Sequence, residues 1–280
     1  MDVDVAWTVS QKQRLKELNA SLEEQDMLFE NAAERDQCFQ KIERALIDKG
    51  KERLEDLRVV KKRPSLSILE NKLAQALTGA GFVQVVTPII LARGLLAKMT
   101  ITDGHPLHKQ VFWLDEKRCL RPMLAPNLYF LLKDLVRLWE KPIRIFEVGP
   151  CFRKESHGAL HMNEFTMLNL VELGLPQEQR FERLRELAEL VMDAAGIKEY
   201  SLQSEQSEVY GDTIDVVAGG IELGSGAMGP HLLDSAWDIY DAWVGIGFGL
   251  ERLLAVNEGS QSVQRMGRSL TYLDSVRLNI

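Results

Sequence analysis

The first sixty residues carry hydrophobic positions at a helical spacing. Ser10 followed by Gln13 is a capping-box pattern, which predicts a short helix that runs to Leu18. A longer helical pattern covers residues 31–57, and the proline that follows a basic triplet ends it because proline cannot continue a helix. These elements predict a small helical appendage at residues 1–63.

The main domain, predicted at residues 64–280, opens with a helix and a strand. Ser67 and Glu70 repeat the capping-box pattern. The apolar positions that follow share one helical face: Leu66, Leu69, Leu73 and Leu77. Residues 82–86 are rich in valine and are followed by Pro88, which predicts a strand.

The rest of the chain alternates between strands and helices. Predicted strands cover residues 112–114, 119–121, 143–148, 151–153, 165–172, 214–217 and 221–225, and a glycine-rich strand starts at residue 243. Predicted helices cover residues 126–138, 177–195 and 250–256. Gly219-Gly220 is suited to a hairpin turn between two of the strands. Strands joined by hairpins, with helices outside them, indicate an α+β fold with an antiparallel sheet flanked by helices.

The composition is that of a globular protein. Of 280 residues, 45% are hydrophobic and 27% charged, which suits one large domain with an appendage. The longest apolar stretch, residues 85–96, is interrupted by proline, arginine and glycine, so we expect no membrane span. Cys38, Cys119 and Cys151 lack zinc-site spacings, and the first residues lack the regions of a secretion signal. We therefore expect a reduced, cytoplasmic protein.

A basic stripe runs through an otherwise acidic chain of net charge −7. Its members are Arg44, Lys49, Lys51, Arg53, Arg58, Lys61, Lys62 and Arg63. The stripe could neutralise the phosphates of a nucleic acid such as tRNA. The alternative is a solvated helix face, which the charge pattern alone favours.

Three blocks of the main domain stand out together. The first is the helix, strand and proline of residues 69–88; the second is Phe152-Arg153-Lys154-Glu155, a loop, and residues 165–169; the third is residues 245–252, with alternate glycines before Glu251-Arg252. In this order they resemble motifs 1, 2 and 3 of the class II aminoacyl-tRNA synthetases. Longer stretches, at residues 120–129, 145–156, 164–169 and 247–252, resemble the pyrrolysyl-tRNA synthetase family within that class.

The resemblance implies a site for ATP, in which Arg153 and Arg252 are the catalytic residues. The ATP-binding residues that it implies are Arg153, Glu155, His161, Met162, Phe165, Glu222, Ser225 and Arg252. An amino-acid carboxylate is already ionised at neutral pH, so its activation needs positioning and charge stabilisation at phosphate rather than a general base. A guanidinium suits that task. A surface ion pair between Arg153 and Glu155 is the structural alternative.

Glu222 and Ser225 resemble the family's magnesium-holding pair. Oxygen ligands suit Mg²⁺ that bridges ATP phosphates. Strict alternation along a strand would place the two residues on opposite faces of the sheet. We therefore predict a bulge, permitted by Gly224, that brings both to one face.

Two apolar faces predict a pocket for a long substrate. Ala125, Leu128, Tyr129 and Leu132 share a helical face, and Phe165, Met167, Asn169 and Val171 alternate along a strand. Core packing is the ordinary meaning of such faces, but an amide among them is costly to bury without a partner. The resemblance makes Asn169 the residue that binds the substrate's acyl amide, and makes Tyr210 a cap. The implied amino-acid-binding residues are Ala125, Leu128, Tyr129, Leu132, Asn169, Val171, Tyr210, Trp243 and Gly245.

The resemblance implies an enzyme with Mg²⁺ as cofactor. Its reaction would be ATP-dependent activation of pyrrolysine, a bulky Nε-acyl-lysine, and transfer to the 3′ end of a cognate tRNA. A homodimer packed near residues 69–88 is expected, and the need for a separate small tRNA-binding protein stays open. Two alternatives are a class II-like ligase with another acceptor and a non-catalytic module that senses tRNA or amino acid.

Overall fold

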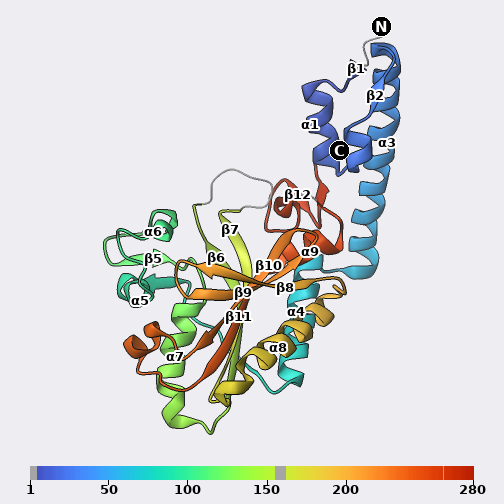
Figure 1. The fold of residues 1–280 in the computed structure, drawn as a ribbon. Coiled ribbons are helices and arrows are strands. Elements are labelled where there is room, and N and C mark those ends of the chain that lie inside the picture. Colours follow the sequence, from blue (N-terminus) through green and yellow to red (C-terminus); the bar gives the residue numbers. More distant parts are fainter. Residues whose placement is uncertain (1–4, 155–161, 261) are drawn as a thin grey trace. The chain divides into compact units, whose positions relative to one another are not determined.

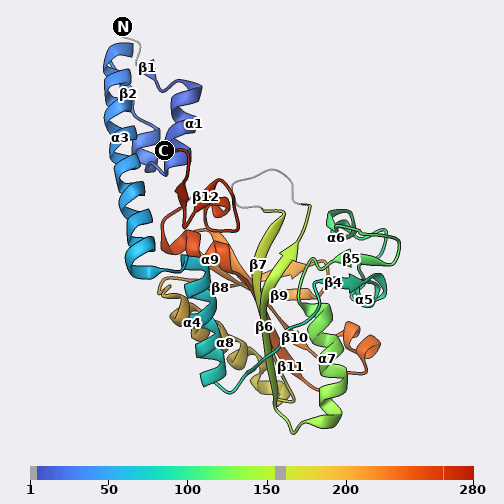
Figure 2. The same ribbon diagram turned by 180° about the vertical axis from the view of Figure 1, so that it is seen from behind.

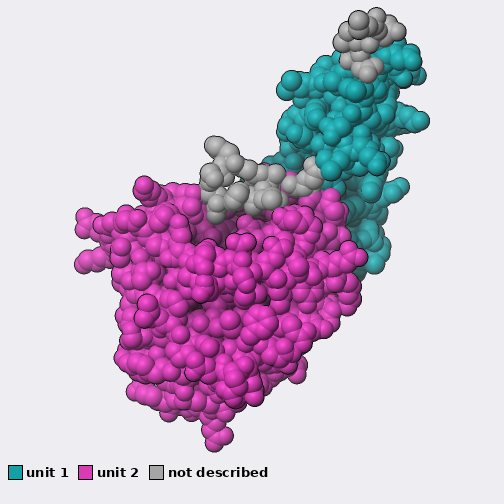
Figure 3. All heavy atoms as spheres, viewed as in Figure 1, with its two compact units in different colours: residues 1–65, 269–280 teal, residues 66–268 magenta. Residues whose placement is uncertain are grey.

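The computed structural model describes residues 5–154, 162–260 and 262–280, which form two compact units (Figure 3). The first unit holds residues up to 65 together with residues 269–280, and the second holds residues 66–268. The sequence pattern placed the C-terminal segment in the main domain, because nothing in its composition signals contacts with the helical unit.

The first unit is built on three helices. They are α1 (Val9–Leu18), α2 (Leu22–Gln25) and α3 (Ala32–Asp56), and α3 continues into a π-helical turn at Leu57–Lys61. Two short ribbons accompany them, β1 (Val5–Ala6) with β2 (Leu28–Phe29) and β12 (Tyr272–Leu273) with β13 (Val276–Arg277). The capping box of α1 is Thr8 with Gln11, so the prediction of Ser10 with Gln13 was wrong by two residues. Thr8 is extended, and its hydroxyl accepts the Gln11 N–H, which starts the helix earlier.

The second unit is organised around a seven-stranded sheet (Figure 1). Its strand order is β3-β6-β7-β11-β10-β9-β8, in which only β3 and β6 are parallel. The strands are β3 (Val83–Gln84), β6 (Ile143–Phe152), β7 (Glu164–Leu173), β8 (Ser201–Ser207), β9 (Gly211–Ala218), β10 (Ile221–Gly229) and β11 (Trp243–Gly249). This confirms the predicted α+β fold with a mostly antiparallel sheet, including the hairpin at Gly219-Gly220.

Strand β6 joins two segments that the sequence pattern separated at Gly149-Pro150. Proline is tolerated there because its missing N–H would point away from β7. On that outer side the Pro150 carbonyl accepts from Arg121 Nε at 2.8 Å, and two residues on the Phe152 N–H donates to the Arg121 carbonyl at 3.0 Å. No ladder hydrogen bond is therefore lost at Pro150.

Helices cover both faces of the sheet (Figures 1 and 2). Helices α4 (Ser65–Gly79), α8 (Arg180–Ala195) and α9 (Leu250–Asn257) pack on one face, and α7 (Ala125–Leu138) with the 3₁₀ turn η3 (Leu232–Trp237) packs on the other. The smaller elements are β4 (Ile90–Ala92), α5 (Arg93–Lys98), α6 (Pro106–Gln110), β5 (Arg118–Leu120), η2 (Gln177–Gln179) and η4 (Val263–Arg265). Among the described residues, no helix combines the length and the apolar character needed to cross a membrane.

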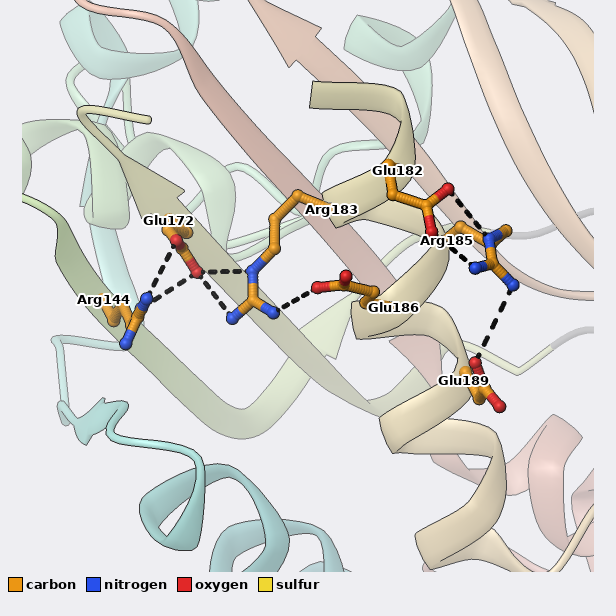
Figure 4. Close-up of polar contacts among 7 residues, drawn as sticks. All are labelled: Arg144, Glu172, Glu182, Arg183, Arg185, Glu186 and Glu189. Carbon is orange, nitrogen blue, oxygen red and sulfur yellow. Dashed lines mark hydrogen bonds and ion pairs between the residues drawn. The ribbon is translucent and has the colours of Figure 1, made fainter. Parts of the chain in front are cut away.

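A buried carboxylate ties α8 to the sheet (Figure 4). The side chain of Glu172, on β7, is only 4% exposed. It pairs with Arg144 of β6, at 3.0 Å from Nε, and with Arg183 of α8, at 2.8 Å from Nη2. Arg183 also pairs with Glu186 one helical turn later, at 2.7 Å. Two guanidiniums thus hold one buried acid and join β6, β7 and α8.

Candidate active site

A cavity of about 510 Å³ opens between α7, the sheet and the β8–β9 turn. Its described lining residues all lie in the second unit. Its walls come from β7, β9, β10 and β11, from the first turns of α7 and α9, and from the segment after β6. Residues more than a hundred positions apart in the sequence therefore meet at one site.

Arg153 and Arg252 both line this cavity. Arg153 follows β6, and its guanidinium lies 5.3 Å from the centre of the Phe165 ring on β7. Its Nε donates to the Pro122 carbonyl at 2.9 Å. Arg252, in the first turn of α9, donates from Nη1 to the Glu222 carbonyl at 3.0 Å. The cavity thus presents two guanidiniums from distant parts of the chain, with an aromatic ring beside one of them.

A buried ion pair fixes the carbonyl that orients Arg153. Arg121, just before Pro122, is 2% exposed, and its Nη1 lies 2.7 Å from Oε1 of the buried Glu147. Arg121 also binds the outer side of β6 through its own backbone and side chain. Residues 121 and 122 are therefore locked to β6, which limits the positions open to the Arg153 side chain.

The predicted bulge is present in β10. The register with β9 shifts between Glu222 and Gly224, so Leu223 is the extra residue. Glu222 and Ser225 consequently both line the cavity, and the Ser225 hydroxyl donates to Asp215 Oδ1 at 2.6 Å. Sequence reasoning missed Asp215, because only the observed register sets it opposite Ser225.

These oxygen donors fit a magnesium ion that shares its coordination with phosphates. Glu222 supplies a carboxylate, Ser225 a hydroxyl and Asp215 a second carboxylate beside it. Among the described residues, no three His, Cys, Asp or Glu side chains are grouped so as to hold a metal by themselves. A cation here would take most of its remaining ligands from a bound substrate and water.

The glycines of β11 leave the cavity floor bare. Gly245 and Gly247 line it, and a Cβ at Gly247 would lie 3.2 Å from Met167 Cε. A side chain at this position would therefore crowd β7 and occupy the cavity. Its absence lets a flat ligand lie against the backbone.

The other end of the cavity is apolar. The nine residues predicted to bind the amino acid all line it: Ala125, Leu128, Tyr129, Leu132, Asn169, Val171, Tyr210, Trp243 and Gly245. The Tyr210 ring, in the β8–β9 turn, lies 6.1 Å from the Trp243 ring. Met162 and Phe165 line the cavity too, whereas the predicted residues Glu155 and His161 lie outside the described residues.

Asn169 differs from its neighbours. It is partly exposed on β7, faces the cavity, and has Gly247 directly opposite on β11. In the part of the chain that the structure describes, its side-chain amide makes no hydrogen bond to the protein. The alternative in which Asn169 satisfies itself within the core is not what these residues show, and its amide is available to a ligand.

A buried acid lies at the base of the cavity and was not singled out from the sequence. Glu251 is 2% exposed and accepts the Thr166 N–H at 2.9 Å. Burial raises the pKa of its carboxyl above the ordinary value, and the Thr166 hydrogen bond opposes that shift. Arg252, the next residue in the sequence, faces the cavity. Glu251 therefore has a structural role, whereas Arg252 is available to a ligand.

The basic stripe of the first unit is partly neutralised. Four of its members lie near acids: Lys51 near Asp48, Arg53 and Lys61 near Asp274, and Arg58 near Glu55. Asp274 has a side chain only 2% exposed. These pairs neutralise part of the charge of the stripe.

Comparisons with known proteins give a consistent picture. The family model of the phenylalanyl tRNA synthetase beta chain CLM domain matches residues 51–242. A histidine–tRNA ligase of Methanocaldococcus jannaschii is 31% identical over 111 residues, which is 38% of this chain and 26% of that protein. A threonine–tRNA ligase of Wolbachia pipientis is 31% identical over 102 residues, 34% of this chain and 16% of that protein. These matches thus span about a quarter or less of the curated relatives.

Solved structures extend the likeness to the whole chain. A crystal structure of pyrrolysyl-tRNA synthetase from Desulfitobacterium hafniense superposes with a TM-score of 0.95 at 62% identity. The match covers 99% of this chain and all of that one. A second structure, of PylSc from the same organism, has a TM-score of 0.94 at 61% identity and covers 100% of this chain and 98% of that one.

Proposed function

Because the chain belongs to the class II aminoacyl-tRNA synthetases and, within them, to the pyrrolysyl-tRNA synthetase family, we propose that it is a pyrrolysine–tRNA ligase. It activates pyrrolysine, a bulky Nε-acyl-lysine, with ATP and transfers the aminoacyl group to the 3′ end of a cognate tRNA. The observation that carries the proposal is one cavity, lined by described residues, that holds the guanidiniums of Arg153 and Arg252 and, among apolar side chains, the Asn169 amide.

The first step joins the substrate carboxylate to the α-phosphorus of ATP. A carboxylate oxygen attacks phosphorus, the bond to the β-phosphate oxygen breaks, and pyrophosphate leaves. Arg153 stabilises the charge that develops at the α-phosphate, and Arg252 holds the terminal phosphate. Phe165, against which Arg153 already lies, stacks on adenine. No group has to remove a proton, because the attacking carboxylate is ionised.

Mg²⁺ is the proposed cofactor. Glu222 and Ser225 would hold it, with Asp215 fixing the Ser225 hydroxyl. When bound, it neutralises negative charge on the phosphates. The residues of the chain position it: the bulge at Leu223 brings both donors to the cavity face.

The apolar end of the cavity selects the amino-acid substrate by the length of its side chain and by one polar contact. The Asn169 amide donates to the acyl carbonyl of the substrate, while Ala125, Val171 and Gly245 leave room for its bulky tail. Tyr210, at the cavity edge, covers the bound side chain. Among the described residues that line this apolar end, there is no lysine or arginine to pair with a phosphorylated or acidic side chain.

The proposed partners are tRNA, a separate tRNA-binding protein and a second copy of the chain. We infer that the first unit contacts tRNA through Arg44, Lys49, Lys51, Arg53, Arg58, Lys61, Lys62 and Arg63, and a separate tRNA-binding protein is a further candidate partner. A homodimer near residues 69–88 is supported by exposed apolar side chains: Val83 is 46% exposed and Val86 is 88% exposed. Three free cysteines agree with a reducing, cytoplasmic setting.

Pyrophosphate exchange tests the proposal. Purified protein with ATP and Mg²⁺ should exchange label only when an Nε-acyl-lysine is present, with lysine itself as the negative control. Aminoacylation of tRNA should follow in a second assay. Exchange without transfer to any tRNA would instead favour a class II-like ligase with another acceptor, and absence of ATP binding would favour a non-catalytic module.

A further inference from the structure

A buried carboxylate lies behind the apolar end of the cavity. Asp234, in the 3₁₀ turn η3, is 2% exposed and does not line the cavity itself. It accepts three hydrogen bonds: from the Tyr129 hydroxyl at 3.0 Å, from Trp243 Nε1 at 2.8 Å and from the His231 N–H at 2.6 Å. Two of these donors are side chains that bound the cavity.

The surroundings of Asp234 differ from those of Glu147 and Glu172. Within residues 162–260 and the other described ranges, no lysine, arginine or histidine side chain pairs with it. Glu147 and Glu172, buried to a similar degree, each pair with an arginine. A buried carboxylate held only by neutral donors carries a desolvation cost that packing alone would not require.

The three hydrogen bonds set the angle between two rings. The Tyr129 ring is perpendicular to that of Trp243, at 86° with centroids 5.8 Å apart, and is stacked on Trp237 at 5.4 Å. One carboxylate binds the polar atoms of Tyr129 and Trp243 through separate oxygens. The ring surface of Tyr129 and Trp243 that these contacts do not cover is thereby left for the cavity.

Gly229 makes this arrangement possible. It pairs with Trp243 across the β10–β11 ladder, and a Cβ there would lie 1.8 Å from the indole Nε1. The indole therefore passes over Gly229 to reach Asp234. Without the carboxylate, the indole N–H would be buried and unpaired and the tyrosine hydroxyl would keep only its contact with Tyr210, so the indole would gain by turning toward the cavity.

We propose that Asp234 is a positioning residue for substrate selection: its buried carboxylate holds Tyr129 and Trp243 so that the far end of the cavity is long and apolar. This inference rests on the proposed function. Asp234 acts through the two rings and touches no substrate. Its loss shortens and polarises the slot that accepts the acyl tail, while the ATP end of the cavity is unchanged.

The test compares Asp234→Ala with Asp234→Asn in pyrophosphate exchange, using one long and one short Nε-acyl-lysine. Asp234→Ala should raise the KM for the long substrate about 10- to 100-fold, change the KM for ATP less than about twofold, and reduce the preference for the long substrate. Asp234→Asn should restore most of that preference. Its amide oxygen accepts from the indole and His231, and its NH₂ donates to the Tyr129 oxygen.

Asp238→Asn is the matched control. It removes a carboxylate from the end of the same turn, where the side chain is 64% exposed and pairs with Lys133, so the substrate profile should stay as in wild type. Tyr129→Phe is the second variant if Asp234→Ala does not fold, because it keeps the ring and removes the hydroxyl that donates to Asp234 and also contacts Tyr210. Tyr129→Phe should lower the preference for the long substrate about threefold or more and leave the KM for ATP unchanged.

Two results overturn the inference. One is an unchanged substrate preference in folded Asp234→Ala or, where that variant is unfolded, in Tyr129→Phe. The other is an equal rise in the KM values for ATP and for the amino acid, which would show a general structural role. Wild-type protein without exchange on any Nε-acyl-lysine would refute the proposed function itself, and so is distinguishable from both.

Discussion

Strand β7 has one filled face and one open face, although its residues simply alternate between them. Leu168 and Leu170 are fully buried under α4, α8 and α9. Met167 and Asn169, between and beside them, line the cavity. The period of two lets a single strand contribute to stability on one side and to ligand binding on the other.

Two buried acids, one on each side of the sheet, are held in different ways. Glu172, on the filled side, is held by two arginines and ties α8 to the sheet (Figure 4). Asp234, behind the open side, is held by a tyrosine, an indole and a backbone N–H. The charge pairs of Glu172 join two elements, whereas the neutral donors of Asp234 include two rings that face the cavity. Charge pairing is not confined to the filled side, because Glu147, directly opposite Asn169, pairs with Arg121.

The largest effect should come from the filled face. Leu170→Ala removes a fully buried side chain from the larger core, so we expect a loss of about 2–5 kcal/mol in the free energy of unfolding. Urea denaturation measures this loss. Exchange activity per folded molecule should remain, because the side chain points away from the cavity. If folded Leu170→Ala also loses exchange activity, the two faces do not have separate roles.

Arg153→Ala should lower the rate of pyrophosphate exchange without lowering the stability of the fold. We expect exchange to fall about 10²- to 10³-fold, because one preorganised donor at the reacting phosphate is lost. Thermal unfolding should shift little, since the guanidinium lies at the cavity rather than in a core. Lys154→Ala is the control: it removes the next positive charge, whose Nζ lies 5.6 Å from the Phe112 ring. Retained activity in Arg153→Ala would refute its assigned role.

Much of the filled face could be predicted from the sequence. Leu69, Leu73 and Leu77 repeat at helical spacing and are buried as expected. Strand β8 could not be predicted in this way, because its side chains are mostly polar and exposed. Edge strands owe their place to backbone hydrogen bonds with one neighbour, and these leave no apolar alternation in the sequence.

The open face was predictable only in part. The order of the motifs and the alternation along the strand predicted that Arg153, Asn169 and Arg252 share one site, and all three line the same cavity. Asp215 and Asp234 were not predicted. The register of β9 and β10 sets the partner of Asp215, and the packing of the η3 turn on α7 sets the partners of Asp234. Such contacts join positions distant in the sequence, and no local pattern encodes which polar atom a buried acid will meet.

The smallest effect, and the sharpest comparison, is at Asn169, the direct neighbour of Leu170 on the opposite face. Its amide makes no hydrogen bond within the described chain, so Asn169→Ala orphans no protein group, and stability should change by about 1 kcal/mol or less. Discrimination should suffer instead. Loss of one polar contact to the acyl amide should cost roughly 1–3 kcal/mol in kcat/KM between amide-bearing and amide-lacking lysine derivatives.

Exchange kinetics with such a substrate pair, run beside urea denaturation of Asn169→Ala and Leu170→Ala, measure both quantities for adjacent residues. Leu170→Ala should lower stability and keep the substrate ratio, and Asn169→Ala should do the reverse. If Asn169→Ala is as unstable as Leu170→Ala, the amide is part of the core. If its substrate ratio equals that of wild type, Asn169 has no part in recognition. Either result would end the distinction between the two faces, because it rests on the alternation of these neighbouring side chains.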